Sequence, residues 1–145
     1  MTAGNMTIFY ADDDFEDLDF FTEVTNIIDR EITVVTHDCG DKLIAALRNP
    51  PPSPHIIFLD LNMPGRNGFD ILEELKTTEN LKGIPVVIFS TSNDAVNIAR
   101  SRSLGANLYL PKLPSYAAFK KSIEDTLKIN WDTFKPNASN FLYSI

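Results

Sequence analysis

The stretch HIIFLDLNMPG at residues 55–65 joins a short apolar run to a loop marked by proline and glycine. Four of its first five residues are Ile, Phe or Leu, which is typical of a strand buried on both faces of a sheet. Asp60 follows where this strand ends, and a lone carboxylate there indicates a reactive group at a sheet edge. A second apolar run at residues 7–11 leads into Asp12 and Asp13 in the same way. We therefore expect the three acids to form one site.

Strand-like segments alternate with helical segments along the chain. Runs rich in branched and aromatic residues predict five strands, at residues 7–11, 32–36, 55–59, 85–89 and 107–110. Apolar residues at helical spacing predict five helices, at residues 15–28, 41–48, 67–77, 93–103 and 115–128. Asp14 and Ser115 are expected N-caps, and Gly105 is expected to end the fourth helix. Because right-handed crossovers place helices on both faces of a parallel sheet, the alternation predicts a three-layer α/β sandwich.

The order of the strands is the step that local patterns leave open. In the doubly wound order 2-1-3-4-5 of a flavodoxin-like five-stranded parallel sheet, the first and third strands are neighbours, and ligands bind beyond the strands' carboxyl ends. That order would bring Asp12, Asp13 and Asp60 together. A flavin site of the same topology is disfavoured, because acids after the first strand would repel the phosphate that such a loop must hold.

The composition indicates one acidic domain. The chain has 145 residues, 43% of them hydrophobic, and a formal net charge of −7, which disfavours direct nucleic-acid binding. No apolar segment approaches the roughly 20 residues that a membrane span needs, and the N-terminus lacks the layout of a signal peptide. We therefore expect a cytoplasmic protein without membrane contact. The single cysteine, Cys39, excludes an internal disulfide.

Three neighbouring carboxylates repel one another unless a cation joins them or some take up protons. Oxygen ligands of this kind favour Mg²⁺, which binds through one or two carboxylates, several waters and a phosphate oxygen. An aspartate beside such an ion is able to attack a phosphoryl group and form an acyl phosphate. Because the transferred group carries spread negative charge, a hydroxyl and a second cation are expected nearby. Ser90 at the end of the fourth strand and Lys112 after the fifth are the candidates.

Together these features resemble the receiver domain of two-component response regulators. The shared pattern is an acidic pair after the first strand, Asp60 followed by Pro64 and Gly68, a Ser or Thr after the fourth strand and a lysine after the fifth. Five such features in this order are highly specific. The resemblance covers residues 6–128 and implies a single-domain, chemotaxis-regulator-like protein. Residues 129–145 would then be a C-terminal extension, with no output domain.

The resemblance also implies a role for each site residue. Asp60 would be the phosphoacceptor, Ser90 would bond the phosphoryl group, and Lys112 would pair with it. Tyr109, three residues before the lysine, takes the position of the family's aromatic switch residue. The implied Mg²⁺ site uses Asp13 directly, Asp12 through water, Asp60 and the backbone carbonyl of Asn62.

The implied function is phosphorelay signalling rather than enzymatic turnover. A histidine kinase or a histidine phosphotransfer protein would donate the phosphoryl group to Asp60, and Ser90 and Tyr109 would then move toward it. This movement would change the face formed by the fourth helix, the fifth strand and the fifth helix. A downstream protein partner is expected on that face, or the phosphoryl group would pass along a relay.

Two features depart from the family's pattern. Proline commonly follows the lysine directly, often through a cis peptide bond, whereas here Leu113 precedes Pro114. Because a cis bond to leucine costs about 3 kcal/mol or more, this loop is expected to be strained or built differently. The extension is the second departure. Its apolar residues are expected to pack on the domain rather than to form a docking motif: Trp131, Phe134, Phe141, Leu142 and Tyr143.

Simpler interpretations exist for single residues and for the whole chain. Ser90 alone would be a hydroxyl bonded to nearby backbone, Lys112 a solvated lysine and Tyr109 a half-buried aromatic. If Leu113 misplaces the lysine, the fold would serve as a constitutive interaction module without switching. A phosphotransferase of the haloacid-dehalogenase type also uses a strand-end aspartate and Mg²⁺, but normally has an aspartate where this chain has Asn62.

Overall fold

The computed structural model describes residues 6–144. The strands are β1 (Thr7–Ala11), β2 (Thr33–His37), β3 (Ile56–Leu59), β4 (Val86–Ser90) and β5 (Leu108–Pro111). The helices are α1 (Phe15–Ile28), α2 (Gly40–Leu47), α3 (Gly68–Thr77), α4 (Ala95–Ser103) and α5 (Tyr116–Lys128). All neighbouring strands are parallel, in the order β2-β1-β3-β4-β5. This order confirms the expected doubly wound fold.

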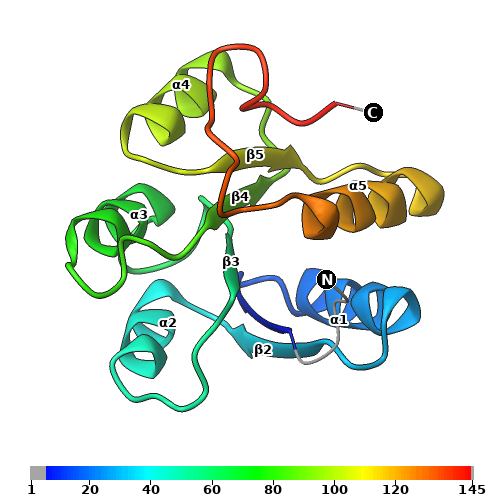
Figure 1. The fold of residues 1–145 in the computed structure, drawn as a ribbon, viewed down its shortest axis with the longest axis horizontal. Coiled ribbons are helices and arrows are strands. Elements are labelled where there is room, and N and C mark those ends of the chain that lie inside the picture. The colour runs from blue at the N-terminus through cyan, green and yellow to red at the C-terminus, as the bar shows by residue number, and fades with distance from the viewer. Residues whose placement is uncertain (1–5, 145) are drawn as a thin grey trace.

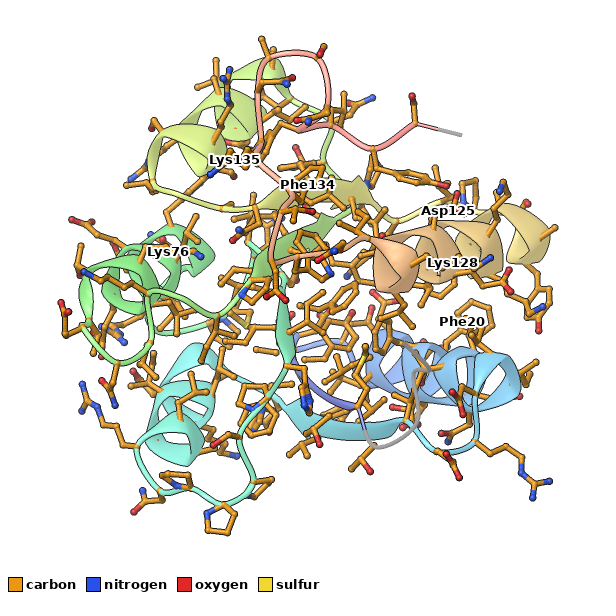
Figure 2. The ribbon with its side chains drawn as sticks, viewed as in Figure 1. Phe20, Lys76, Asp125, Lys128, Phe134 and Lys135 are labelled. Carbon is orange, nitrogen blue, oxygen red and sulfur yellow. The ribbon has the colours of Figure 1, made fainter. Side chains whose placement is uncertain are left out.

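The sheet lies between two layers of helices. Figure 1 shows α1 and α5 on one side and α2, α3 and α4 on the other. On the α1–α5 side the core is aromatic, with the Phe21 ring 4.7 Å from that of Tyr10 and 4.8 Å from that of Phe58, measured between centroids. Phe20 extends this packing between α1 and α5, where its ring lies 4.7 Å from that of Phe119 (Figure 2).

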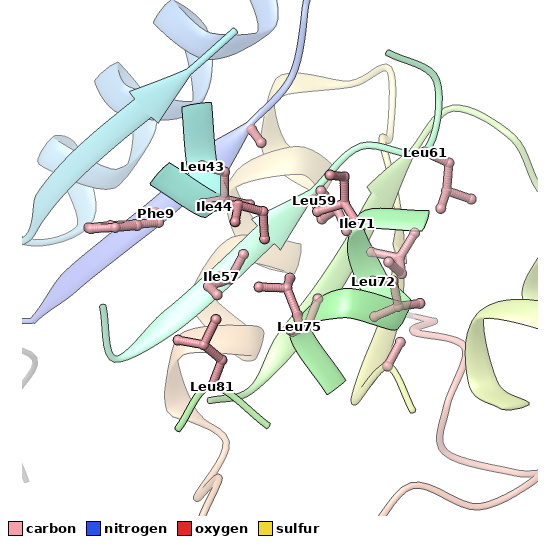
Figure 3. Packing of buried hydrophobic residues seen from close by; sticks show 14 of the residues in the cluster. Phe9, Leu43, Ile44, Ile57, Leu59, Leu61, Ile71, Leu72, Leu75 and Leu81 are labelled. Atoms are coloured by element: carbon pink, nitrogen blue, oxygen red, sulfur yellow. The ribbon is translucent and has the colours of Figure 1, made fainter. Parts of the chain in front are cut away.

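The opposite face of the sheet has an aliphatic core. Figure 3 shows Leu and Ile side chains of α2 and α3 packed on β1 and β3. All four residues of β3 are buried, as its continuous apolar run predicts. Both faces of the central strands are therefore covered, and the polar residues that follow them emerge only at the strand ends.

Capping residues explain most helix boundaries. The Asp14 side chain accepts from the backbone amides of Glu16 and Asp17, and Ser115 caps α5, as expected. Gly105 has a φ of 102°, which a residue with a side chain rarely adopts. The expectation that α4 begins at residue 93 is wrong, because the Asp94 side chain accepts from the amide of Val96 and the helix starts at Ala95.

The C-terminal extension continues the sheet at the β5 edge. The Tyr109 amide donates to the carbonyl of Phe141, and the Tyr143 amide donates back to the Tyr109 carbonyl. Phe141 is buried, whereas Leu142 is 43% exposed. Trp131, Phe134 and Tyr143 pack against the α1–α5 core, so most of the extension's apolar residues are covered. Ile145, its last residue, lies outside the described residues.

Candidate functional site

Three carboxylates meet at the carboxyl edge of the sheet. Ala11 of β1 pairs with Leu59 of β3, so the residues that follow these strands emerge side by side. One carboxylate oxygen from each of Asp12, Asp13 and Asp60 lies within 4.8 Å of the others. The expected meeting of the three acids is therefore present in the structure, and it follows from the neighbouring positions of β1 and β3.

Asp60 is a buried carboxylate in a negatively charged neighbourhood. Asp60 is only 6% exposed, and this burial is the main reason why its pKa rises to about 7. The nearby Lys112 ammonium favours the ionised form, while the charge of Asp12 opposes it. A group with this pKa is only partly ionised near neutral pH, so an added cation would increase its nucleophilic fraction.

Asp12 is completely buried and has three donors. Its Oδ2 atom accepts from the Tyr10 hydroxyl at 2.5 Å and from Lys112 Nζ at 2.6 Å, and its Oδ1 accepts from the Asp14 amide at 3.0 Å. Tyr10 was not among the residues singled out from the sequence. Its position two residues before Asp12 on β1 places both side chains on one face of the strand, and that alternation is the signal that would have identified it.

Lys112 reaches the acids from the loop after β5. Its Nζ lies 4.0 Å from Asp60 Oδ1, and it also bonds Asp17 Oδ2 of α1 at 2.8 Å. The cis peptide bonds of the described residues lie within Pro50–Pro52, so the bond from Lys112 to Leu113 is trans. The loop is therefore built differently from the common cis form. This is one of the two outcomes that the sequence suggested for it. Leu113 does not displace the lysine from the acids.

The carboxylates around Lys112 raise its pKa by more than burial lowers it. Burial alone would lower the pKa of Lys112, but the bonds to Asp12 and Asp17 and the charge of Asp60 raise it above its usual value. Lys112 is therefore a fully charged ammonium near neutral pH. Asp17, like Tyr10, was not singled out from the sequence, although it lies in the first turn of α1, shortly after Asp12 and Asp13.

Ser90 and Tyr109 lie next to this edge on β4 and β5. The Ser90 side-chain oxygen accepts from the Ser92 amide at 3.2 Å, and its carbonyl accepts from the Lys112 amide at 2.8 Å. Tyr109 is completely buried, and its hydroxyl donates to the Ser92 carbonyl at 2.8 Å. The loop after β4 therefore connects the two residues that the sequence suggested as a switch.

Gly68 holds the loop after Asp60 close to the strand end. A Cβ atom at this position would lie 2.6 Å from the Asp60 carbonyl oxygen and 2.5 Å from Leu61 Cα, so no larger residue fits without a shift. The Gly68 amide donates to the Leu61 carbonyl at 2.9 Å. The glycine that the motif requires therefore has a steric cause here.

The donor set fits a hard divalent cation such as Mg²⁺. Asp12, Asp13 and Asp60 supply only oxygen, the ligand type that Mg²⁺ prefers. Asp13 is exposed, so water has access to the open side of the site. Asn62 is also exposed and follows Asp60 by two residues, which leaves its carbonyl as the candidate backbone ligand.

The chain is similar to known response regulators. A model of the response regulator receiver domain matches residues 8–124. Response regulator Rcp1 of Synechocystis sp. is 43% identical over 61 residues, which make up 42% of this chain and 42% of Rcp1. That alignment thus spans less than half of the relative's length.

Solved structures extend the similarity to nearly the whole chain. The phosphorylated cyanobacterial phytochrome response regulator RcpA superimposes with a TM-score of 0.81 at 28% identity, over 94% of this chain and 100% of RcpA. The Mn²⁺-bound form of Rcp1 has a TM-score of 0.77 at 27% identity, over 92% of this chain and 99% of that one. With the family model covering most of the sequence, this chain belongs to the response regulator receiver domain family.

Proposed function

We propose that this receiver domain accepts a phosphoryl group on Asp60 and acts as a single-domain switch or relay in two-component signalling. The position of Asp60 carries the proposal: it is buried beside Asp12 and Asp13, with Lys112 Nζ 4.0 Å away. The phosphorylated state of RcpA, a similar structure, supports it.

The chemistry of transfer follows from the charges in the site. A carboxylate oxygen of Asp60 attacks the phosphorus of a phosphohistidine; the P–N bond breaks, its electron pair stays on the imidazole, which then takes a proton, and an acyl phosphate forms. The Lys112 ammonium, 4.0 Å from Asp60 Oδ1, and the Ser90 hydroxyl, at the end of the neighbouring strand β4, would bond the new phosphoryl oxygens. Asp13, Asp60, the Asn62 carbonyl and, through water, Asp12 would hold Mg²⁺, and the ion would supply positive charge that offsets the charge of those oxygens.

The donor is a histidine kinase or a histidine phosphotransfer protein, and the chain does not turn over a substrate of its own.

We place the protein in the cytoplasm. None of the helices in residues 6–144 has the length and apolar character needed to cross a bilayer. The net charge of −7 argues against direct nucleic-acid binding.

The output is a change at the face formed by α4, β5 and α5. Charge-assisted bonds from the phosphoryl group to Ser90 and Lys112 pull the loop after β4, and Tyr109 follows because its hydroxyl bonds Ser92 in that loop. Tyr109 also holds residues 141–143 through its backbone. A downstream protein would therefore meet a face that includes the extension, and Val96 of α4 is 71% exposed.

Intact-mass spectrometry after incubation with Mg²⁺ and acetyl phosphate tests the first step. We expect the wild type to gain one phosphoryl group and Asp60→Asn to gain none. Asp70→Asn is the matched control, because Asp70 is an exposed aspartate on α3 that lies outside the site. Equal labelling of wild type and Asp60→Asn would contradict the assignment.

A further inference from the structure

Lys112 bonds Asp17, a carboxylate that is not among the site residues expected from the sequence. Its Nζ bonds Asp12 Oδ2 at 2.6 Å and Asp17 Oδ2 at 2.8 Å, whereas Asp60 Oδ1 is 4.0 Å away. A separation of 4.0 Å is too long for a hydrogen bond. Two of the three ammonium protons therefore point to Asp12 and Asp17, and neither of these bonds reaches the phosphoacceptor.

The two carboxylates that hold Lys112 differ in their access to water. Asp12 is completely buried, and loss of the ammonium would leave its Oδ2 atom with the Tyr10 hydroxyl alone. The Asp17 side chain is 36% exposed, so water can replace the ammonium there. Leaving a buried charge without its partner costs far more than leaving an exposed one. The bond to Asp17 is therefore the cheaper one to break.

The start of α1 fixes Asp17 in this position. Its amide donates to the capping Asp14 side chain at 3.3 Å, and it lies in the first turn, where the helix dipole favours a negative charge. The Lys112 side chain is only 9% exposed, and its Nζ lies 5.6 Å from the Phe89 ring centroid. Packing therefore leaves this side chain few alternative conformations. A small rotation at the end of its side chain is enough to exchange one oxygen partner for another.

We propose that Asp17 is a positioning residue that holds Lys112 away from Asp60 until a phosphoryl group arrives. The ammonium then exchanges Asp17 for a phosphoryl oxygen and keeps its bond to Asp12. This inference rests on the proposed phosphorylation of Asp60. It makes Asp17 a restraint on phosphorylation, because each transfer must break the Lys112–Asp17 pair.

Phosphorylation kinetics of Asp17→Asn test the exchange. Acetyl phosphate is supplied below saturation with Mg²⁺, and intact mass is followed over time. We expect Asp17→Asn to be labelled about two- to fivefold faster than the wild type, the factor expected from a partly exposed ion pair. Asp19→Asn is the matched control: it makes the same charge change on an exposed residue of α1 that has no bond to Lys112, and it should match the wild type.

A second measurement reports on the contact without phosphorylation. In protein labelled with ¹⁵N at lysine Nζ, the Lys112 ammonium signal is assigned by its absence in Lys112→Arg. We expect faster proton exchange with water and a shifted signal in Asp17→Asn, and no change in Asp19→Asn. An unchanged Lys112 signal in Asp17→Asn would overturn the inference, as would a changed signal without faster labelling. If no protein gains mass, the proposed function itself fails, and the lysine signal still shows whether the contact exists.

Discussion

Two ion-pair networks in this molecule differ in charge balance: one has an excess of negative charge and the other is neutral. At the carboxyl edge of the sheet, one ammonium, that of Lys112, lies within 4.0 Å of three carboxylates. Beside the loop after β3, two arginines pair with two carboxylates at 2.6–3.0 Å: Arg48, Arg66, Asp41 and Glu74. The second network joins α2, α3 and the loop, and its charges cancel.

Burial makes the imbalance of the first network consequential. Asp12 and Asp60 are almost completely removed from water, whereas Asp41 and Arg48 have side chains more than half exposed. Exposed, balanced pairs contribute little to stability and need no ligand. A buried excess of negative charge must bind protons or a cation, so the first network has a reason to bind a cation such as Mg²⁺ and the second has none.

The largest expected effect that tests this contrast comes from Asp60→Asn. The pKa of Asp60 is raised to about 7 in the folded state. Its contribution to stability is therefore complete below its unfolded pKa of about 4 and is lost as the pH rises through about 7. Without Mg²⁺, we expect the wild type to lose about 3 kcal/mol of unfolding free energy relative to Asp60→Asn between about pH 5 and about pH 8.

Urea unfolding of both proteins in the presence of EDTA measures this difference. Added Mg²⁺ should reduce the loss for the wild type at the higher pH and leave Asp60→Asn less affected, since the cation offsets the buried charge. If the unfolding free energies of the two proteins changed with pH in parallel, the ionised Asp60 carboxylate would not destabilise the folded state.

A smaller effect is expected from Tyr10→Phe. The variant keeps the ring in the aromatic core but removes the hydroxyl that donates to Asp12. Losing one donor to a buried carboxylate should lower the unfolding free energy by about 1–2 kcal/mol. Tyr143→Phe is the matched control, because it removes a hydroxyl that donates to the partly exposed Asp125. Equal losses in the two variants would mean that burial of the acceptor does not matter here.

The smallest effect is expected in the balanced network. Arg66→Ala removes two ion pairs whose partners remain accessible to water. We expect a loss of at most about 1 kcal/mol, reduced further in high salt, and an unchanged rate of labelling by acetyl phosphate. Urea unfolding at two salt concentrations and intact mass measure these outcomes. A large fall in the labelling rate would show that this network also supports the site.

Local sequence signals located the elements well because strands and helices have different periodicities. All five strands and five helices occur within two residues of their expected positions. Two of the shifts have a visible cause: the Asp94 side chain caps α4 and delays its start, and β2 extends to His37 because the backbone of this residue pairs with that of Ala11. Asp12, Asp13 and Asp60 were identifiable because carboxylates directly after buried strands have no structural reason to be there.

Residues that act through contacts between distant elements were not identifiable in this way. Tyr10 looked like an ordinary strand aromatic, and Asp17 like one of several acids in a first helical turn. Their roles depend on Lys112, which lies 95 residues beyond Asp17 in the chain. No local pattern connects two such positions, because their proximity requires β5 to be placed beside β4 at the far side of the sheet.

The sequence alone therefore determined the alternation of elements, the parallel sheet and the acids at the strand ends, because these depend on periodicity and on the residue at each strand end. Only the tertiary structure decided that Lys112 is held by Asp12 and Asp17 rather than by Asp60, and that residues 141–143 cover the β5 edge. Both outcomes depend on distances between separate elements, which are set by the packing of the whole core.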